Sequence, residues 1–192
     1  AAFYARAIPE NEAVSTASSI PEQVRANGGT KMIDELQQKH FNVKYLGWTS
    51  GGDRFRIYMK NAPKFNAVGL PDFSGVKMRD NPIYDAFLKA LNASTHPLPS
   101  SAVFGALEKG VVEASAWATN GLKGLKWDKF LRHAVDADFY RTDLGWIMNL
   151  DKWNGLSAKA KGIIQNSVIE QEVINAAQLS AMAVKEKATL IK

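Results

Sequence analysis

The chain has 192 residues, 46% of them hydrophobic, which is enough to bury a core in one large domain or two small ones. It contains no cysteine, which excludes disulfide frameworks, cysteine-ligated zinc sites and thiolate nucleophiles. Lys and Arg outnumber Asp and Glu by 24 to 19 without forming a dense basic block, and this excess suits anionic ligands in general. No apolar run approaches the ~18 residues that a membrane-spanning helix needs.

The first 60 residues predict helices followed by two strands. Pro9 and Pro21 are candidate helix starts, and Asn27-Gly28-Gly29 predicts a turn between two helices. A buried strand is expected over residues 43–48 and a half-buried one over 55–59, with a turn at Gly51-Gly52-Asp53 between them. The alternation in the second strand places Arg56 on the face opposite Phe55.

The middle of the chain alternates strands and helices, which predicts an α/β fold with a largely parallel sheet. Ligands of such sheets generally lie beyond the carboxyl ends of the strands, where Arg79 and Trp117 stand. The expected elements are a strand over 75–79, a helix capped by Asn81 with Pro82 in its first turn, a strand over 95–98, a helix capped by Ser100 or Ser101, and a strand over 111–117.

The last third predicts a short helix over 127–131, strands over 134–138 and 144–149, and one long helix from Ser157 to Lys192. At ~1.5 Å per residue that helix would run roughly 50 Å. Its apolar stripe changes face part of the way along, which indicates a helix that packs against two bodies. A helical contact between two copies of the chain gives the same pattern.

Motifs of covalent and metal chemistry are missing from the sequence. There is no Gly-x-Ser-x-Gly elbow, phosphate-binding loop or dinucleotide fingerprint. The three histidines, His40, His96 and His133, stand singly and not at metal-ligand spacing. We therefore expect no catalytic residues, no metal site and no cofactor.

Arg79 is the leading candidate for ligand binding. An arginine that ends a short apolar strand can present its planar fork to a carboxylate in a partly desolvated crevice. From the pattern alone, a surface arginine remains equally open. Trp117, at the end of another strand, fits either a pocket wall or core packing.

Three ordered blocks resemble the DctP-type substrate-binding subunits of TRAP (tripartite ATP-independent periplasmic) transporters. Residues 72–79, Asp-Phe-Ser-Gly-Val-Lys-Met-Arg, resemble the family's Asp-Leu-x-Gly-x-Lys-x-Arg signature. Residues 106–113 resemble the Ala-Leu-x-x-Gly-x-Val-Asp block, and residues 148–157 resemble the Asn-x-x-x-Trp-x-x-Leu-Ser region before the long helix. Upstream, residues 52–58 resemble the family's Gly-Phe-Arg strand.

The resemblance implies roles for individual residues. Arg79 matches the arginine that binds the ligand carboxylate, Arg56 a second arginine facing the cleft, and Trp117 a ligand-contacting position. Asp143 falls near a position that is often Gln. Two further positions complete the set: Ser100 stands where some sugar-acid binders have a phenylalanine, and Ala116 replaces a metal-holding glutamate of oxo-acid binders, so a metal-bridged ligand is not expected.

At the level of the fold, the resemblance implies a two-lobed periplasmic binding protein with a long lobe-bridging helix, incomplete in this chain. Residues 1–70 would form the remainder of lobe I, 71–135 the α/β unit of lobe II, 136–156 the crossing strands and 157–192 the bridging helix. Family members have further chain before the position of Ala1 and after that of Lys192. The expected partners are a small organic carboxylate, the TRAP membrane subunits and, through the long helix, a second copy of the chain.

Two other classes of function compete with a binding protein of the periplasm. An enzyme acting on organic acids would use the same Arg79 to hold its substrate, but the sequence offers it no candidate nucleophile, base or metal set. Nucleic-acid binding depends only on the net charge of +5, so we expect no nucleic-acid partner. Lactate, oxo acids, dicarboxylates and sugar acids all share the arginine anchor among family members.

Overall fold

The computed structural model describes residues 20–190, and for residues 50–53 and 142–143 it describes only the backbone. The chain forms two compact units: unit 1 comprises Ala1–Asp53 and Arg141–Met182, and unit 2 comprises Arg54–Tyr140 and Ala183–Lys192. The helix predicted to start at Pro9 lies outside the described residues. One long helix and two long strands contribute residues to both units.

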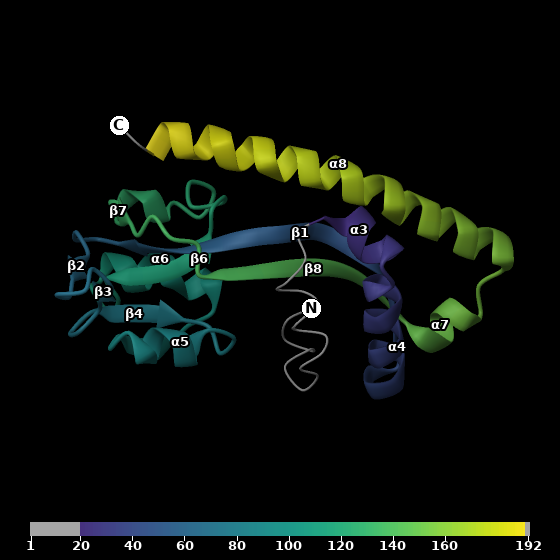
Figure 1. Cartoon of the computed structure of the whole chain (residues 1–192), viewed down its shortest axis with the longest axis horizontal. Helices are drawn as coiled ribbons and strands as arrows, with labels where there is room; N and C mark the ends of the chain where they lie inside the picture. The colour runs from purple at the N-terminus through teal and green to yellow at the C-terminus, as the bar shows by residue number, and fades with distance from the viewer. Residues whose placement is uncertain (1–19, 191–192) are drawn as a thin grey trace. The chain divides into compact units, whose positions relative to one another are not determined.

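Unit 1 contains α3 (Pro21–Ala26), α4 (Gly29–Phe41) and α7 (Leu150–Asn154), with parts of β1 (Val43–Met59), β8 (Tyr140–Asn149) and α8 (Ala158–Leu190) (Figure 1). The predicted turn between α3 and α4 is confirmed, and Gly28 adopts a left-handed φ of 84° there. The predicted turn at residues 51–53 is wrong, because β1 is one continuous strand. Within the sheet β1 also pairs with β8, and continuous strand pairing of this kind can outweigh the local turn preference of glycines.

A buried carboxylate fixes α8 within unit 1. Glu172, which is 4% exposed, accepts hydrogen bonds from Arg25 Nη2 at 2.6 Å and from the Trp48 backbone N–H at 2.9 Å. Gly47 makes this approach possible, because a Cβ at that position would lie 2.3 Å from Glu172 Oε1. The absence of a side chain at Gly47 therefore lets the helix reach the backbone of β1.

Unit 2 is built around a mixed sheet of β5 (Ser94–Pro97), β4 (Lys77–Asp80), β6 (Ala114–Ala118), β1 and β7 (His133–Ala134), in that order, to which β8 adds by pairing with β1. β4 is parallel to both of its neighbours, whereas β1 is antiparallel to β6 and β7. The predicted parallel arrangement thus holds for the strand–helix–strand part alone. The other elements of unit 2 are α5 (Asp85–Ala90), α6 (Ser100–Glu108), the 3-10 helix η1 (Trp127–Lys129), and a separate pair of strands, β2 (Lys64–Phe65) and β3 (Pro71–Asp72).

Alternate residues of β1 face two different cores of unit 2, as the period of a strand requires. Ile57 and Met59 belong to the cluster that contains Leu88 of α5, whereas Tyr58 belongs to the cluster that contains Val103 and Leu107 of α6. Helices α5 and α6 therefore cover opposite faces of the sheet (Figure 1).

Several predicted helix boundaries shift in the structure. Residues Asn81–Tyr84 form a turn, closed by a Tyr84 N–H to Asn81 C=O bond of 3.0 Å, and α5 begins only at Asp85. Ser100 is the first helical residue of α6 and not its cap, because Pro99 occupies the cap position. The long helix is confirmed as α8, at 33 residues. No helix within residues 20–190 is long and apolar enough to span a membrane.

We predict that Glu172→Ala destabilises unit 1 by about 2–3 kcal/mol, because it leaves Arg25 and a buried backbone N–H without their acceptor. Urea unfolding followed by circular dichroism measures this loss. Glu170→Gln, an exposed change two residues away, is the control. A loss below about 0.5 kcal/mol for Glu172→Ala would contradict the anchoring role.

Candidate functional site

Arg79 lies near the carboxyl end of β4 and is buried, with 4% of its surface exposed. Its Nε–H donates to the Leu98 carbonyl at 2.9 Å, and Nη1–H donates to the Tyr84 hydroxyl at 2.9 Å. Both acceptors are neutral. Among the described side chains no carboxylate lies within ion-pair distance of this guanidinium. The site therefore holds the fork in place without an ion pair to any described carboxylate.

Tyr84 connects Arg79 to the neighbouring strand. Its hydroxyl accepts from Arg79 and donates to the Ala116 carbonyl of β6 at 3.3 Å. Burial raises the pKa of Tyr84 to about 12, although the positive charge of Arg79 opposes the rise. The phenol therefore stays neutral at physiological pH and cannot serve as the counterion of Arg79.

Aromatic rings form one wall around the guanidinium. The Arg79 Cζ lies 5.7 Å from the ring centroid of Trp117, within cation–π range. Trp117 in turn packs edge-on against Trp127 at 4.9 Å between centroids and contacts Phe55 at 6.4 Å. Trp117, backed by these rings, covers one side of the charge with apolar surface, and a lower local dielectric strengthens the attraction of the guanidinium for an anion.

Asp80 follows Arg79 in β4 and is 3% exposed, with its Oδ1 lacking a hydrogen-bond partner among the described residues. Burial, together with a hydrogen bond to Asp85 and the charge of Asp85, raises the pKa of Asp80 to about 6. Asp85 stays ionised, since hydrogen bonds from Lys89 and Thr95 lower its pKa. Asp80 is thus a nearby acid that loses its charge under mildly acidic conditions.

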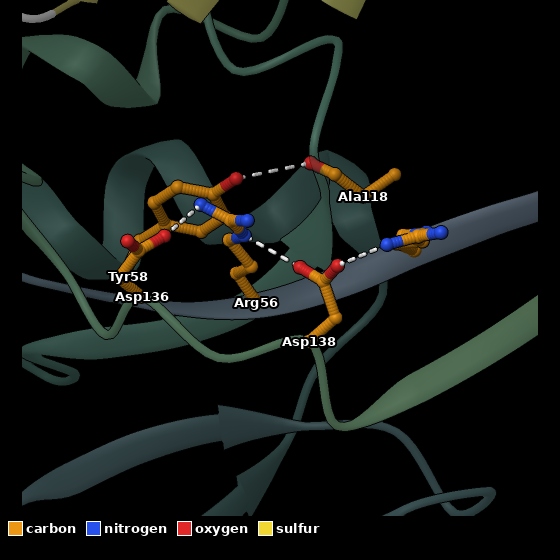
Figure 2. A network of polar contacts seen from close by, with 6 residues as sticks. Arg56, Tyr58, Ala118, Asp136 and Asp138 are labelled. Carbon is orange, nitrogen blue, oxygen red and sulfur yellow. Dashed lines mark hydrogen bonds and ion pairs between the residues drawn. The ribbon is translucent and has the colours of Figure 1, made fainter.

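Arg56 occupies a different electrostatic setting, shown in Figure 2. It is the cross-strand partner of Trp117, so the two residues share one side of the sheet. Its Nε–H donates to Asp138 at 2.5 Å and Nη1–H to Asp136 at 2.6 Å. The hydrogen bond to Asp138 raises the pKa of Arg56. The charge of Arg56, unlike that of Arg79, is already balanced.

The network around Arg56 includes two further groups. Asp138 also accepts from Arg54 Nη1 at 3.1 Å, and although burial opposes it, hydrogen bonds from the two arginines lower the pKa of Asp138. The Tyr58 hydroxyl donates weakly to the Ala118 carbonyl at 3.5 Å, and burial raises the pKa of Tyr58 to about 12. Two arginines and two aspartates therefore form a network with no net charge (Figure 2).

The other two predicted site residues are Ser100 and Asp143. Ser100 is exposed at the start of α6, two residues after the carbonyl that accepts from Arg79. Asp143 lies in β8, and its side chain is outside the described part of the structure. Within the described side chains, no group of three or more His, Asp or Glu is arranged to hold a metal ion. The roles of Ser100 and Asp143 in ligand binding stay predictions.

The sequence reasoning missed three contributors to the Arg79 environment: Tyr84, the Leu98 carbonyl and Phe55. A backbone carbonyl carries no sequence signal of its own. Tyr84 stands five residues after Arg79, within the helix predicted to begin after Asn81, and no pattern in the sequence singles it out. Phe55 was placed correctly on the face opposite Arg56, but nothing in the sequence showed which rings it meets.

The sequence profile of bacterial extracellular solute-binding protein family 7, DctP, matches residues 21–192. The C4-dicarboxylate-binding periplasmic protein DctP of Rhodobacter capsulatus is 27% identical over 149 residues, which is 76% of this chain and 42% of that protein. A solute-binding protein of Verminephrobacter eiseniae is 29% identical over 133 residues, covering 68% of this chain and 38% of the relative. The chain thus spans about 40% of the length of these curated relatives.

Solved structures share the fold. A TRAP periplasmic solute-binding protein from Sulfitobacter sp. NAS-14.1, with bound β-D-galacturonate, superposes with a TM-score of 0.81 at 12% identity, covering 98% of this chain and 63% of that one. The corresponding protein from Pseudomonas putida F1, with bound D-glucuronate, gives 0.78 at 17% identity, covering 98% and 62%. The α/β, two-lobed fold class expected from the sequence is thereby confirmed. With a family profile that matches nearly the whole described chain, the protein belongs to bacterial extracellular solute-binding protein family 7, the DctP family.

Proposed function

We propose that this chain is part of the solute-binding subunit of a TRAP transporter and that Arg79 holds the carboxylate of a small organic acid. The observation that carries the proposal is the buried guanidinium of Arg79, whose two hydrogen-bond acceptors in the described structure are both neutral oxygens. Burying a cation without a counterion costs several kcal/mol. A ligand carboxylate would offset that cost when it binds.

The unused donors of Arg79 suit this role. Leu98 and Tyr84 engage one N–H each on Nε and Nη1, and Nη2 makes no hydrogen bond to a described residue. A carboxylate can accept two parallel N–H bonds from such a fork. Each of these charge-assisted hydrogen bonds is about twice as strong as a hydrogen bond between neutral groups. Trp117 would shield these bonds from water. The two existing hydrogen bonds fix the fork before the ligand arrives, so little side-chain entropy is lost on binding.

Arg56 would contribute in a different way. One of its partners, Asp136, has a side chain that is 83% exposed, so this ion pair adds little stability. A second oxygen of the ligand can replace Asp136 on Nη1 at small cost. The more buried pairing with Asp138 would keep the guanidinium in place during the exchange.

The class of ligand follows from the chemistry of the site and from the relatives. One relative is described as C4-dicarboxylate-binding, and solved proteins of the same fold hold D-glucuronate, β-D-galacturonate or malonate. All of these molecules carry a carboxylate, the group that an arginine fork recognises. We propose a periplasmic location and docking on TRAP membrane subunits for the whole protein.

We propose that the protein binds its ligand without converting it chemically, since the family is one of solute-binding proteins. An enzyme acting on organic acids would have to turn over its bound acid, whereas a binding protein is stabilised by it and releases it unchanged. A homodimer through α8 stays a prediction. The exposed apolar side chains of α8 compatible with one are Ile163, Ile169, Val173, Ile174, Met182 and Val184.

We predict that Arg79→Ala weakens carboxylate binding by about 30- to 100-fold, because charge-assisted hydrogen bonds are lost. Isothermal titration calorimetry of the full chain with D-glucuronate, malonate and succinate measures the change. Arg132→Ala, which removes an exposed arginine from the same unit, is the matched control. Unchanged affinity of Arg79→Ala for a ligand that the parent protein binds would refute the proposed role.

We also predict that carboxylate affinity rises as the pH falls from 7.5 to 5.0. The pKa of Asp80 is raised to about 6, so Asp80 is ionised above that pH and neutral below it. Ionised Asp80 repels the ligand and offsets Arg79, while a ligand carboxylate with a pKa below about 4 keeps its charge over this range. The expected gain is roughly tenfold.

The Asp80→Asn variant separates this effect from other titrations. It should bind at pH 7.5 nearly as tightly as the parent binds at pH 5.0, with a flatter pH profile in the same calorimetric assay. Glu108→Gln, an exposed acid in α6, should retain the profile of the parent. A profile of Asp80→Asn as steep as that of the parent would show that Asp80 is not the titrating group.

A further inference from the structure

A carboxylate near the end of α8 holds the segment that connects β6 to η1. Glu186 accepts a hydrogen bond from the Gly121 backbone N–H at 2.7 Å on Oε2 and another from the Lys123 N–H at 2.8 Å on Oε1. All three residues belong to unit 2. Glu186 makes no ion pair with any described residue. Among the described residues, the partners of its carboxylate are therefore the two backbone amides of this segment.

The segment is shaped to receive an anion. Gly121 adopts a left-handed φ of 93°, which other residues rarely do, and the chain turns back so that the Leu125 N–H meets the Gly121 carbonyl at 3.0 Å. Leu122 between the two donors is 2% exposed and faces the core. Its burial leaves the amides on either side free to bind one carboxylate, as in other backbone anion sites. Each oxygen of Glu186 satisfies one of them.

Trp117 lies against the start of this segment and against η1, into which the segment leads. A Cβ on Gly121 would lie 3.4 Å from Trp117 Nε1, which puts the backbone of the segment against the indole N–H edge. At the other end, the Trp127 ring packs edge-on against Trp117 at 4.9 Å. Trp117 in turn lies 5.7 Å from the Arg79 guanidinium. An unbroken series of contacts therefore runs from Glu186 to the candidate carboxylate anchor.

We propose that Glu186 is a positioning residue for ligand binding: by fixing the amides of Gly121 and Lys123, it sets the indole of Trp117 against Arg79. Glu186 acts through Trp117 and requires no contact with the ligand. The proposal rests on the proposed function of Arg79. Loss of the Glu186 carboxylate frees two amides, lets the segment shift and loosens the wall that shields the arginine from water.

Glu186→Gln tests this role at nearly constant size. The oxygen of the glutamine amide can accept from one backbone N–H, whereas its nitrogen, itself a donor, faces the other. We expect carboxylate affinity of the full chain to fall by about 3- to 10-fold with D-glucuronate or malonate. In ¹⁵N NMR spectra without ligand, the Trp117 indole N–H signal, assigned with Trp117→Phe, should shift. The Trp48 and Trp153 indole signals, which come from unit 1, should stay in place.

Two further variants accompany it. Glu170→Gln removes the same charge from an exposed position of the same helix and should change neither signal nor affinity. Glu186→Asp, whose shorter side chain can reach one amide at most, should give a shift of the Trp117 signal in the same sense. Circular dichroism confirms that each variant is folded, so that a loss of affinity is not a loss of fold.

The outcomes separate this inference from the proposed function. An unmoved Trp117 signal in both Glu186 variants would overturn it, whatever Arg79 does. A shifted signal with unchanged affinity, while Arg79→Ala abolishes binding, would also overturn it and leave the anchor intact. If Arg79→Ala leaves binding unchanged, the proposed function is wrong, and the role of Glu186 in binding, which depends on it, is wrong as well. A shifted signal with weaker binding supports the inference.

Discussion

The candidate site depends on one constraint: a guanidinium buried at the end of a strand and held there by two neutral oxygens. The Leu98 carbonyl and the Tyr84 hydroxyl fix Arg79 without neutralising it, and Trp117 covers its face. Each of these contacts requires a different element to be in place, namely the segment after β5, the turn before α5 and strand β6. The parallel pairing of β4 with β5 and β6 brings them together, so the sheet topology is what assembles the site.

Arg56 shows why two arginines in one sheet need not do the same work. Both are within reach of Trp117, yet Arg56 is matched by Asp136 and Asp138, and its network has no net charge. An arginine that already has carboxylate partners attracts an incoming anion less than one whose partners are uncharged. The sequence pattern singled out Arg79 at a strand end, and the resemblance implied that both arginines face the ligand cleft. The carboxylate partners of Arg56 lie 80 and 82 positions further along the chain, which local patterns do not reveal.

Local sequence signals predicted the α/β class, the strand that carries Arg79 and the length of α8, because these depend on periodicity and on a few capping or turn residues. They failed at residues 51–53, where strand pairing overrides a Gly-Gly-Asp turn, and at the start of α5, where a turn precedes the helix. For the site, the sequence predicted Arg79 and Trp117 as separate strand-end residues. It could not predict Tyr84, Leu98 or Glu186, since their roles arise only from tertiary contacts.

Helix α8 is attached through main-chain amides in both units: Glu172 receives the Trp48 N–H, and Glu186 receives those of Gly121 and Lys123. Every residue type except proline supplies such a donor. The positions that donate these amides can therefore change their side chains over evolutionary time without losing the attachment, provided that the backbone keeps its path, Gly47 stays small and residue 121 keeps its left-handed φ. The side chains of Gln165 and Asn175 likewise donate to the main-chain carbonyls of Leu46 and Thr49. The helix thus uses backbone groups for much of its attachment, which allows it to persist while the sequence around it diverges.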